Sequence, residues 1–429
     1  MTEVIGAGLA GSEAAWALAE RGVEVALIEQ KPARRSPAHS SDALCELVCS
    51  NSLKSDDVFG NACGLLKEEM RRLRSLTMEA AAYTRVPAGG ALAVDRNEFS
   101  AYVTQKLRQH PKIRIVCREQ TSLPEAGIVA TGPLTDGALY AAIEARFGGG
   151  LHFYDATAPV VTAESVDLAA AFTADRYGRG TGDYVNCPMT KEEYERFVTE
   201  LLAAEKVTLK EFEKREIFEG CMPVEVMASR GRDALRFGTF KPVGLEDGSG
   251  RRPYAVLQLR RENAEGSLLG LVGCQTNLRF GEQKRVFSLI PALRNAEFVR
   301  YGVMHRNTFL DAPRVLNADF SVKDAPMLFF AGQITGVEGY VESAMSGMLA
   351  GIHLWRKLQG KEPLVPSDAC VMGALSRYVA AENRHFQPMN ANYGILRGMD
   401  VRDKKQKKRL LAERALAEAE AFRAALDGE

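Results

Sequence analysis

The opening segment of the chain, residues 2–31, constrains the fold more strongly than any other stretch. It reads "TEVIGAGLAGSEAAWALAERGVEVALIEQK", in which a short apolar strand leads into Gly6, Gly8 and Gly11, an Ala-rich amphipathic helix follows, and a second strand ends at Glu29. Strand, glycine-rich turn, helix and strand in this order form the βαβ unit of a dinucleotide-binding fold, with G-x-G-x-x-G spacing. The segment therefore predicts an α/β domain with a parallel sheet.

Each glycine of this pattern has a separate expected task. Gly6 permits the tight turn, Gly8 lets the backbone approach a pyrophosphate, and Gly11 lets helix and strand pack closely. The amides at the start of the helix supply donors to the pyrophosphate, and Glu29 is expected to accept a hydrogen bond from a ribose hydroxyl. The cofactor-binding residues predicted here are Gly6, Ala7, Gly8, Leu9, Ala10, Gly11 and Glu29.

Two later segments favour FAD as the dinucleotide. Residues 127–135, "GIVATGPLT", read as an apolar strand with an Ala-Thr-Gly end, and residues 325–355 read as a strand, a glycine-rich turn and a long helix. The turn at Gly332, Gln333 and Gly336 would place backbone beside the ribityl chain and the flavin ring, with a helix N-terminus facing the ring. The alternative is a simple helix cap followed by packing glycines.

A flavin disulfide reductase does not fit this sequence. Such an enzyme needs a separate nicotinamide domain, and no second G-x-G-x-x-G pattern follows a strand elsewhere in the chain. Cys45 and Cys49, in "LCELVCSNSLKS", are separated by three residues, whereas the redox motif of that family has four between its cysteines. The sequence therefore argues against a dithiol at this position.

The order of these segments predicts a Rossmann-like FAD-binding domain of the glutathione-reductase type, interrupted by an inserted α+β domain and followed by a helical C-terminal segment. We expect residues 1–150 to form the first part of the FAD-binding domain and 151–304 the inserted domain. Residues 305–360 would then complete the FAD-binding domain, and 361–429 would be the helical segment.

Composition narrows the class of protein. The 429 residues are 46% hydrophobic and 26% charged, which suits a large buried core. No apolar run approaches the ~20 residues that cross a bilayer, and no signal-type segment opens the chain, so we expect a cytoplasmic protein without a membrane partner. The eight cysteines are irregularly spaced, and no Cys/His set suits zinc, so we expect reduced thiols and no metal.

The 55 basic and 55 acidic residues balance, but cations gather locally. One group lies in "RDKKQKKR", residues 402–409, and another follows a cysteine in "CMPVEVMASRGRDALR", residues 221–236. Each could contact phosphates or be a solvated helix face, and the second could pair with nearby acids. The candidate phosphate-binding residues are Arg71, Arg72, Arg74, Arg230, Arg232, Arg236, Arg402, Lys404, Lys405, Lys407, Lys408 and Arg409.

Two cysteines stand in contexts that suit chemistry. Cys221 lies in "EGCMPVE", where glycine and proline indicate a loop, and Cys49 lies in "CSNSLKS". The other cysteines are expected to be packing residues: Cys63, Cys117, Cys187, Cys274 and Cys370. Among them, Cys187 lies in a polar loop.

Motifs along nearly the whole chain resemble the folate- and FAD-dependent tRNA (uracil-5-)-methyltransferases. They include "VIGAGLAGSEAAWALAERG", "ELVCSNSLKSD", "NACGLLKEEMRRL", "PAGGALAVDRNEFS", "FEGCMPVEVMASRGRDALRFGTFKPVGL" and "FFAGQITGVEGYVESAMSGMLAG". The resemblance implies C5-methylation of the T-loop uridine (position 54) of tRNA, with methylenetetrahydrofolate as carbon donor. It also implies FAD as cofactor, recharged by NADH or NADPH, and the tRNA T-arm as partner.

The resemblance also assigns roles to the two cysteines. It implies that Cys49 lies beside the flavin and that Cys221 is the nucleophile at C6 of the uracil. Thiolate addition at C6 is needed because C5 is otherwise a poor nucleophile, and the thiol pKa of about 8.5 must be lowered or a base supplied. His305 is the candidate for stacking on the pterin of the folate, although a buried structural histidine is the commoner case.

Three alternatives remain open at this point. A related flavoprotein modifies wobble uridines of tRNA, but it is longer and has a further helical domain. A small-molecule flavin oxidoreductase would have no use for the arginines after Cys221. A non-catalytic RNA-binding protein could retain a flavin fold.

Overall fold

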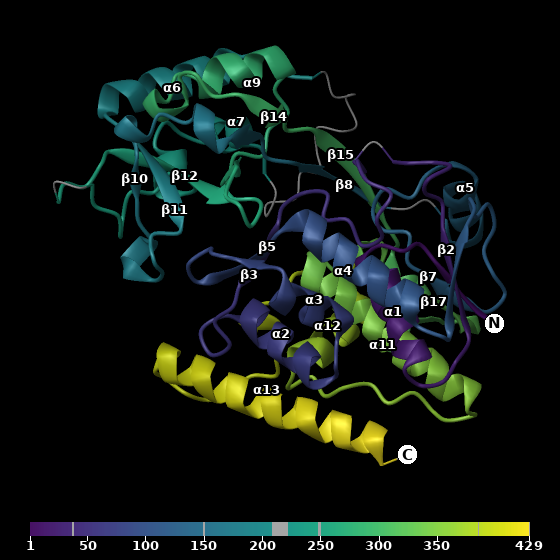
Figure 1. The fold of residues 1–429 in the computed structure, drawn as a ribbon. Coiled ribbons are helices and arrows are strands. Elements are labelled where there is room, and N and C mark those ends of the chain that lie inside the picture. The colour runs from purple at the N-terminus through teal and green to yellow at the C-terminus, as the bar shows by residue number, and fades with distance from the viewer. Residues whose placement is uncertain (37, 149–150, 208–221, 248–249, 385, 429) are drawn as a thin grey trace.

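The computed structural model describes residues 1–36, 38–148, 151–207, 222–247, 250–384 and 386–428. A six-stranded sheet forms the centre of the larger domain, with strand order β16-β17-β7-β1-β2-β6 (Figure 1). Five strands are parallel, and only β16 runs antiparallel to its neighbour. The strands are β1 (Thr2–Ile5), β2 (Val25–Glu29), β6 (Ile113–Cys117), β7 (Gly127–Val129), β16 (Ser321–Val322) and β17 (Ala325–Phe330). The predicted parallel sheet is confirmed.

Two long helices pack against each other beside this sheet. They are α1 (Leu9–Ala19) and α11 (Tyr340–Leu358). Gly347 and Gly351 allow the close approach, because a Cβ at these positions would lie 2.0 Å from the carbonyl oxygen of Ala10 and 2.7 Å from that of Ala14. Both glycines are therefore packing residues of the α1–α11 contact.

The chain between β2 and β6 builds a small layer on the larger domain. A three-stranded sheet, ordered β3-β5-β4, lies there with three helices. The elements are β3 (Ser52–Ser55), α2 (Ala62–Arg72), α3 (Leu76–Tyr83), β4 (Arg85–Val86), β5 (Ala91–Val94) and α4 (Arg96–Gln109). Helix α5 (Gly137–Phe147) follows β7.

A two-stranded antiparallel ribbon joins the two domains. Its strands are β8 (Leu151–Ala156) and β15 (Met304–Phe309), which pair along their whole length. The expected domain boundaries at 151 and 304 fall at the first residues of these strands. The division into domains stays a prediction, and the ribbon is the physical feature that supports it.

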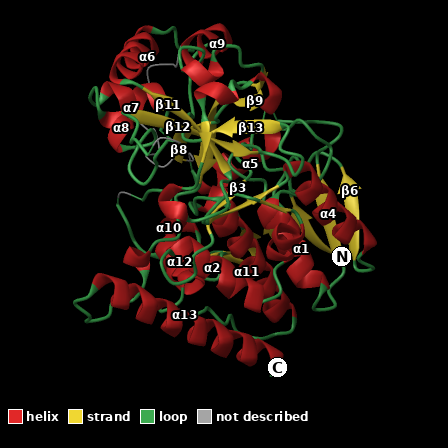
Figure 2. Cartoon of the chain, turned by 60° about the vertical axis from the view of Figure 1, so that its left-hand side comes forward, coloured by secondary structure: helices red, strands yellow, loops and turns green. Residues whose placement is uncertain are grey.

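The inserted segment has its own sheet and its own core. The sheet is ordered β10-β11-β12-β13-β9-β14, and its described pairings are antiparallel. Figure 2 shows helices covering one face of this sheet. The strands are β9 (Val160–Thr162), β10 (Phe172–Thr173), β11 (Tyr184–Met189), β12 (Ala255–Arg261), β13 (Leu268–Leu271) and β14 (Phe298–Arg300). The helices are α6 (Lys191–Ala203), α7 (Val224–Ser229), α8 (Ala234–Phe237) and α9 (Phe280–Phe287).

Helix α6 shows why this segment folds as the sequence indicates. Thr190 caps its N-terminus by accepting a hydrogen bond from the Glu193 amide at 3.3 Å, and the Glu193 carboxylate accepts from the Thr190 amide at 2.8 Å. This reciprocal capping satisfies two donors at the helix start.

The C-terminal segment is helical, as predicted. After α10 (Ala312–Val315), which follows β15, the later helices are α12 (Val371–Ala380) and α13 (Lys404–Asp427). Helix α13 packs its apolar residues, such as Leu411 and Phe422, toward the larger domain beside α2. None of the helices in the described ranges combines the length and apolar character that a bilayer crossing requires.

Candidate functional site: a dinucleotide crevice and a domain junction

A crevice opens where the five parallel strands end. Its wall contains the residues that directly follow the C-terminal ends of β1, β2, β6, β7 and β17. Strand β1 pairs with β2 on one side and with β7 on the other, so the order in which strands are added to the sheet reverses at β1. Such a switch point is where α/β sheets bind ligands. Residues at these strand ends are Gly6, Ala7, Gly8, Gln30, Arg118, Ala130, Thr131, Gly132, Gly332 and Gln333.

The three glycines of the opening turn are required for three different reasons. Gly6 has a φ of +93°, and a Cβ there would lie 2.6 Å from the carbonyl oxygen of Ala130. Gly11 packs against the turn itself, because its Cβ would lie 1.7 Å from the Gly6 carbonyl oxygen. Gly8 has an ordinary φ of −76°, and its Cβ would meet no atom within 4 Å. The protein's own packing therefore does not require glycine at position 8, and the open space there fits a closely approaching ligand.

Two backbone amides fix the carboxylate of Glu29 at the end of β2. Its carboxylate accepts hydrogen bonds from the Ala7 amide and the Lys31 amide, each at 3.0 Å. The side chain is 8% exposed and lines the crevice. These bonds tie the carboxylate to the glycine turn, where a ribose would lie next to a pyrophosphate bound at the start of α1.

The late turn contributes two of its three predicted residues to the crevice. Gly332 and Gln333 line the wall, and the Gly332 amide donates to Ser346 Oγ at 2.7 Å. Gly336 has a φ of +86°, and its Cβ would lie 2.4 Å from the Phe386 ring. Gly336 therefore shapes the turn and packs against Phe386, and it is not among the residues of the crevice wall. Helix α11 follows with Tyr340, which does line the crevice.

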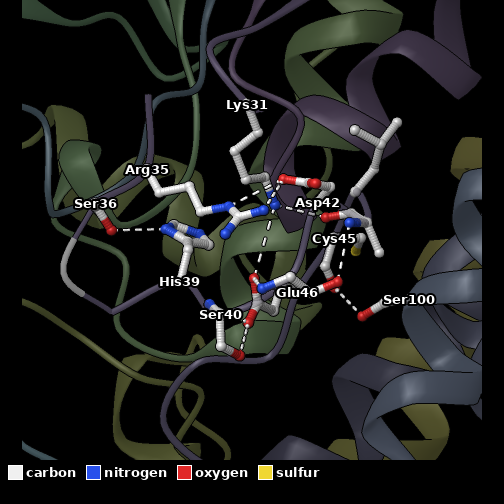
Figure 3. Close-up of polar contacts among 12 residues, drawn as sticks. Lys31, Arg35, Ser36, His39, Ser40, Asp42, Cys45, Glu46 and Ser100 are labelled. Atoms are coloured by element: carbon white, nitrogen blue, oxygen red, sulfur yellow. Dashed lines mark hydrogen bonds and ion pairs between the residues drawn. The ribbon is translucent and has the colours of Figure 1, made fainter. Parts of the chain in front are cut away.

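The loop after β2 lies against the same crevice and is fixed by its own polar contacts (Figure 3). Lys31 Nζ donates to the Ala43 carbonyl at 2.5 Å and lies 3.7 Å from the Glu46 carboxylate. Glu46 also accepts from the Ser40 hydroxyl at 2.8 Å. The loop returns to the glycine turn at Cys45, whose amide donates to the Ala7 carbonyl at 2.8 Å. These contacts hold the "LCELVCSNSLKS" stretch beside the dinucleotide site.

The two cysteines of that stretch differ in their surroundings. Cys45 is 1% exposed, with a φ of 57°, and burial, followed by the charge of Glu13, raises the pKa of its thiol. It is therefore a structural anchor. Cys49 is half-buried, and its amide donates to Tyr340 Oη at 2.6 Å, which links it to the first residue of α11.

Four charged residues surround Cys49 where the two domains meet. We call Arg96, Arg260, Glu262 and Arg300 the junction cluster. Arg96 is the first residue of α4 in the larger domain, Arg260 lies near the end of β12, Glu262 directly follows that strand, and Arg300 ends β14. Arg96 and Arg300 each direct an Nη2 at the Cys49 carbonyl oxygen, at 3.4 and 3.5 Å. Sequence reasoning missed this cluster and Tyr340, because their residues are isolated in unremarkable segments.

The predicted substrate residues are placed apart. Cys221 lies outside the described residues. His305 lies in β15, where its backbone pairs with Asp155, next to the junction of the domains. Arg230 and Arg232 are exposed after α7, and Lys404 and Lys405 are exposed at the start of α13. Figures 1 and 2 both show α13 on the opposite side of the larger domain from α6 and α9, so the two basic segments are not brought together.

Several expectations require correction. Arg71 and Arg72 are engaged within the protein, since Arg71 pairs with Asp56 at 3.0 Å and Arg72 donates to the Leu416 carbonyl of α13 at 3.1 Å. Cys117 is exposed at the end of β6 and is not a packing residue. Cys187 is buried, as expected of a packing residue, but it lies in strand β11 and not in a loop, because the polar stretch continues the inserted sheet. Arg236 pairs with Asp233 at 3.8 Å and lies over the Tyr254 ring.

Metal binding has no support in the described ranges. They contain no group of three or more His, Cys, Asp or Glu side chains arranged to hold an ion. The seven described cysteines are free thiols.

Fold and crevice together define a dinucleotide-binding protein of the glutathione-reductase type with an inserted α+β domain. Comparison with solved structures agrees: GidA of Aquifex aeolicus superimposes with a TM-score of 0.69 at 16% identity. The alignment covers 98% of this chain and 73% of that one. The family model described as "Glucose inhibited division protein A" matches residues 2–362.

Curated relatives are much more similar in sequence. "Methylenetetrahydrofolate--tRNA-(uracil-5-)-methyltransferase TrmFO" of Desulfitobacterium hafniense is 56% identical over 99% of this chain and 98% of its own. The protein of the same name from Geobacter sulfurreducens is 58% identical over 97% of each chain. The chain belongs to the TrmFO family within the glucose inhibited division protein A group.

Proposed function

We propose that this protein is a folate- and FAD-dependent tRNA (uracil-5-)-methyltransferase. It transfers the carbon of methylenetetrahydrofolate to C5 of the T-loop uridine (position 54) of tRNA, and NADH or NADPH recharges its flavin. The observation that carries the proposal is the identity of more than half of all residues to TrmFO proteins over nearly the full length of both chains.

The crevice supports FAD as the cofactor. Gly8 leaves room for a pyrophosphate against the start of α1, and Glu29 is oriented toward the adjacent ribose position. Gly332 and Gln333, with the N-terminus of α11, would lie along the flavin end. When bound and reduced, the flavin supplies the hydride that converts the transferred methylene into methyl.

The chain's own residues would prepare the uracil. The Cys221 thiolate adds to C6, which places the electron pair of the C5–C6 double bond on an enolate and makes C5 nucleophilic. C5 attacks the activated methylene, the C5 proton is lost to a base, and the bond from the methylene carbon to the folate nitrogen breaks, which leaves an exocyclic methylene on C5. Hydride addition to this carbon gives the methyl group, and the resulting enolate expels the Cys221 thiolate from C6, which restores the C5–C6 double bond. Cys49 lies against Tyr340 at the start of α11, next to the crevice residues Val48 and Tyr340, and is proposed to assist proton transfer.

The remaining proposed contacts involve the co-substrates. His305, in the ribbon that joins the domains, is proposed to contact the pterin of the folate. Arg230 and Arg232 near the inserted domain, and Lys404 and Lys405 on α13, are proposed to contact tRNA phosphates of and around the T-arm. Their separation across the molecule would require an extended RNA partner, which tRNA is.

One reconstituted assay separates the alternatives. Purified protein with FAD, methylenetetrahydrofolate and NADPH or NADH is incubated with an unmodified tRNA transcript, and nucleosides are identified by mass spectrometry. We expect ribothymidine, and none in a matched transcript with cytidine at the T-loop position. Modification confined to the wobble uridine would support the related tRNA flavoprotein. Flavin turnover without any RNA product would indicate a small-molecule oxidoreductase.

The cysteine roles have their own test. A tRNA with 5-fluorouridine at the target position should form a denaturation-resistant adduct with the wild type, because fluorine at C5 impedes breakdown of the adduct. Cys221→Ala should lose both adduct and methylation, and Cys49→Ala should lose methylation. An adduct that survives in Cys221→Ala and disappears in Cys49→Ala would reverse the assigned roles.

A further inference from the structure

The junction cluster holds more positive charge than it can neutralise. Arg96 Nη2 lies 2.8 Å from Glu262 Oε2, and Arg260 Nη2 lies 3.9 Å from Glu262 Oε1. The side chains of Arg96, Arg260 and Glu262 are 16%, 11% and 7% exposed. Two guanidinium groups therefore share one carboxylate in a region with little water, and a third, that of Arg300, lies close by.

Arg300 takes no part in these ion pairs with Glu262. Within the described ranges it has no ion pair, and its buried Nε has no hydrogen-bond partner, as is also true of Arg96 Nε. Burial, followed by the charge of Arg96, lowers the pKa of the Arg300 guanidinium. Removing a cation from water without a counterion is unfavourable, so the arrangement calls for an anion close to Arg300.

Cys49 lies directly beside these guanidinium groups, and a charge on its thiol would act on Arg300. The guanidinium groups of Arg96 and Arg300 both approach its carbonyl oxygen, at 3.4 and 3.5 Å, and Arg260 Nη2 donates to the adjacent Ser50 Oγ at 2.9 Å. Among the described residues, the titratable groups that face Cys49 from α4, β12, β14 and α11 are Arg96, Arg260, Glu262, Arg300 and Tyr340.

Tyr340 does not compete for the role of anion. Burial, followed by the negative charge of an ionised Cys49, raises the pKa of its hydroxyl. The phenol therefore stays protonated near neutral pH and can only donate or accept hydrogen bonds. Glu262 is shared between Arg96 and Arg260, so only part of its charge serves Arg300, and Cys49 is the other ionisable group beside Arg300 that can carry a negative charge.

We propose that Arg300, supported by Arg96, is a positioning residue that keeps the Cys49 thiol ionised at neutral pH, with the proton released to water. The thiolate supplies the missing negative charge of the junction cluster, and the cluster supplies the cations that stabilise the thiolate. Because Arg300 belongs to the inserted domain and Cys49 to the dinucleotide domain, the reactivity of the thiol depends on the docking of the two domains. The proposal concerns ionisation alone, so it stands or falls separately from the proposed substrate.

The test measures thiol ionisation in the flavin-loaded protein. Short pulses of iodoacetamide are applied across a range of pH, and peptide mass spectrometry follows Cys49 together with exposed Cys117 as an internal reference in the same molecule. In the wild type we expect the alkylation midpoint of Cys49 below the free-cysteine pKa of about 8.5. Arg300→Met should raise this midpoint by about one pH unit or more, which lowers the alkylation rate at neutral pH about tenfold.

Two further variants separate charge from folding. Arg300→Lys should restore most of the low midpoint, because it keeps a cation. Glu262→Gln should move the midpoint further down, because it removes the only competing carboxylate of the junction cluster; a purely structural role would not produce shifts of opposite sign. The Cys117 profile should be the same in all variants. An unchanged Cys49 midpoint in Arg300→Met, or a wild-type Cys49 that reacts no faster than Cys117 at neutral pH, would overturn the proposal.

Discussion

The dinucleotide crevice and the junction cluster differ in the groups that they offer to a charged partner: mainly backbone amides in the crevice and charged side chains in the cluster. The crevice offers backbone amides at the start of α1 and a single tethered carboxylate, Glu29, so it suits a ligand that brings its own charge. The junction cluster gathers three guanidinium groups near one carboxylate, Glu262, and near the backbone of Cys49. Backbone sites depend on space and geometry, whereas side-chain clusters depend on every partner being present. The two regions should therefore fail in different ways when altered.

The largest effect is expected from filling the space at Gly8. Gly8→Val keeps an allowed backbone conformation but places a side chain where nothing else lies within 4 Å of the Cβ. We expect the purified variant to lose its bound FAD, with the fold retained, because the side chain occupies the pyrophosphate position. The ratio of flavin to protein absorbance and circular dichroism measure both quantities. Gly398→Val is the matched control, since its Cβ also meets open space, away from the crevice. Full flavin content in Gly8→Val would remove the crevice assignment.

The junction cluster should respond in stability. Glu262→Ala leaves two largely buried cations, Arg96 and Arg260, without their carboxylate, and removal of one partner from a buried pair typically destabilises by about 3 kcal/mol or more. Chemical denaturation of the flavin-loaded protein measures the change in the free energy of unfolding. Glu265→Ala, at an exposed position of the following turn, serves as control and should be near neutral. Equal stability of the two variants would mean that the cluster is well solvated.

A smaller effect is expected at Glu29. Glu29→Gln replaces one carboxylate oxygen with an amide donor that cannot accept from both the Ala7 and the Lys31 amides. We expect the Kd for FAD to rise about tenfold, which corresponds to about 1.4 kcal/mol. Fluorescence titration of the flavin-free protein with FAD measures it. A Kd equal to that of the wild type would show that the carboxylate does not contact the ribose.

The smallest change should come from the start of α13. Lys404 and Lys405 are exposed there and Lys407 is half-buried, whereas Lys408 already donates to the Gly60 carbonyl. Changing the first three to glutamine should weaken tRNA binding and reduce the slope of log K against log salt by up to about 0.9 per lost contact. Lys191→Gln, at an exposed position outside α13, is the control. An unchanged slope would identify the start of α13 as a solvated helix face.

The crevice was predictable from sequence and the junction cluster was not, for a physical reason. Strand, glycine turn and terminal acid are neighbours in the chain, so their spacing reports the local geometry of β1, α1 and β2. Arg96 and Arg300 meet only because the ribbon of β8 and β15 folds the inserted domain against α4. An isolated arginine in sequence carries no signal of such a meeting. Cys187 shows the same limit of sequence-based prediction. Its segment reads as a loop in the sequence, but it is a strand because it pairs with β12.

The central claim is that the carbon added to tRNA comes from folate and is reduced on the enzyme. Its most direct test uses methylenetetrahydrofolate with a dideuterated methylene group, an unmodified tRNA transcript and the reduced, FAD-loaded protein. The account predicts ribothymidine that retains both deuterium atoms and gains one unlabelled hydrogen from the reductant. S-adenosylmethionine supplied in place of folate should give no product. Ribothymidine without deuterium, or none at all while the flavin is bound and reduced, would contradict the account.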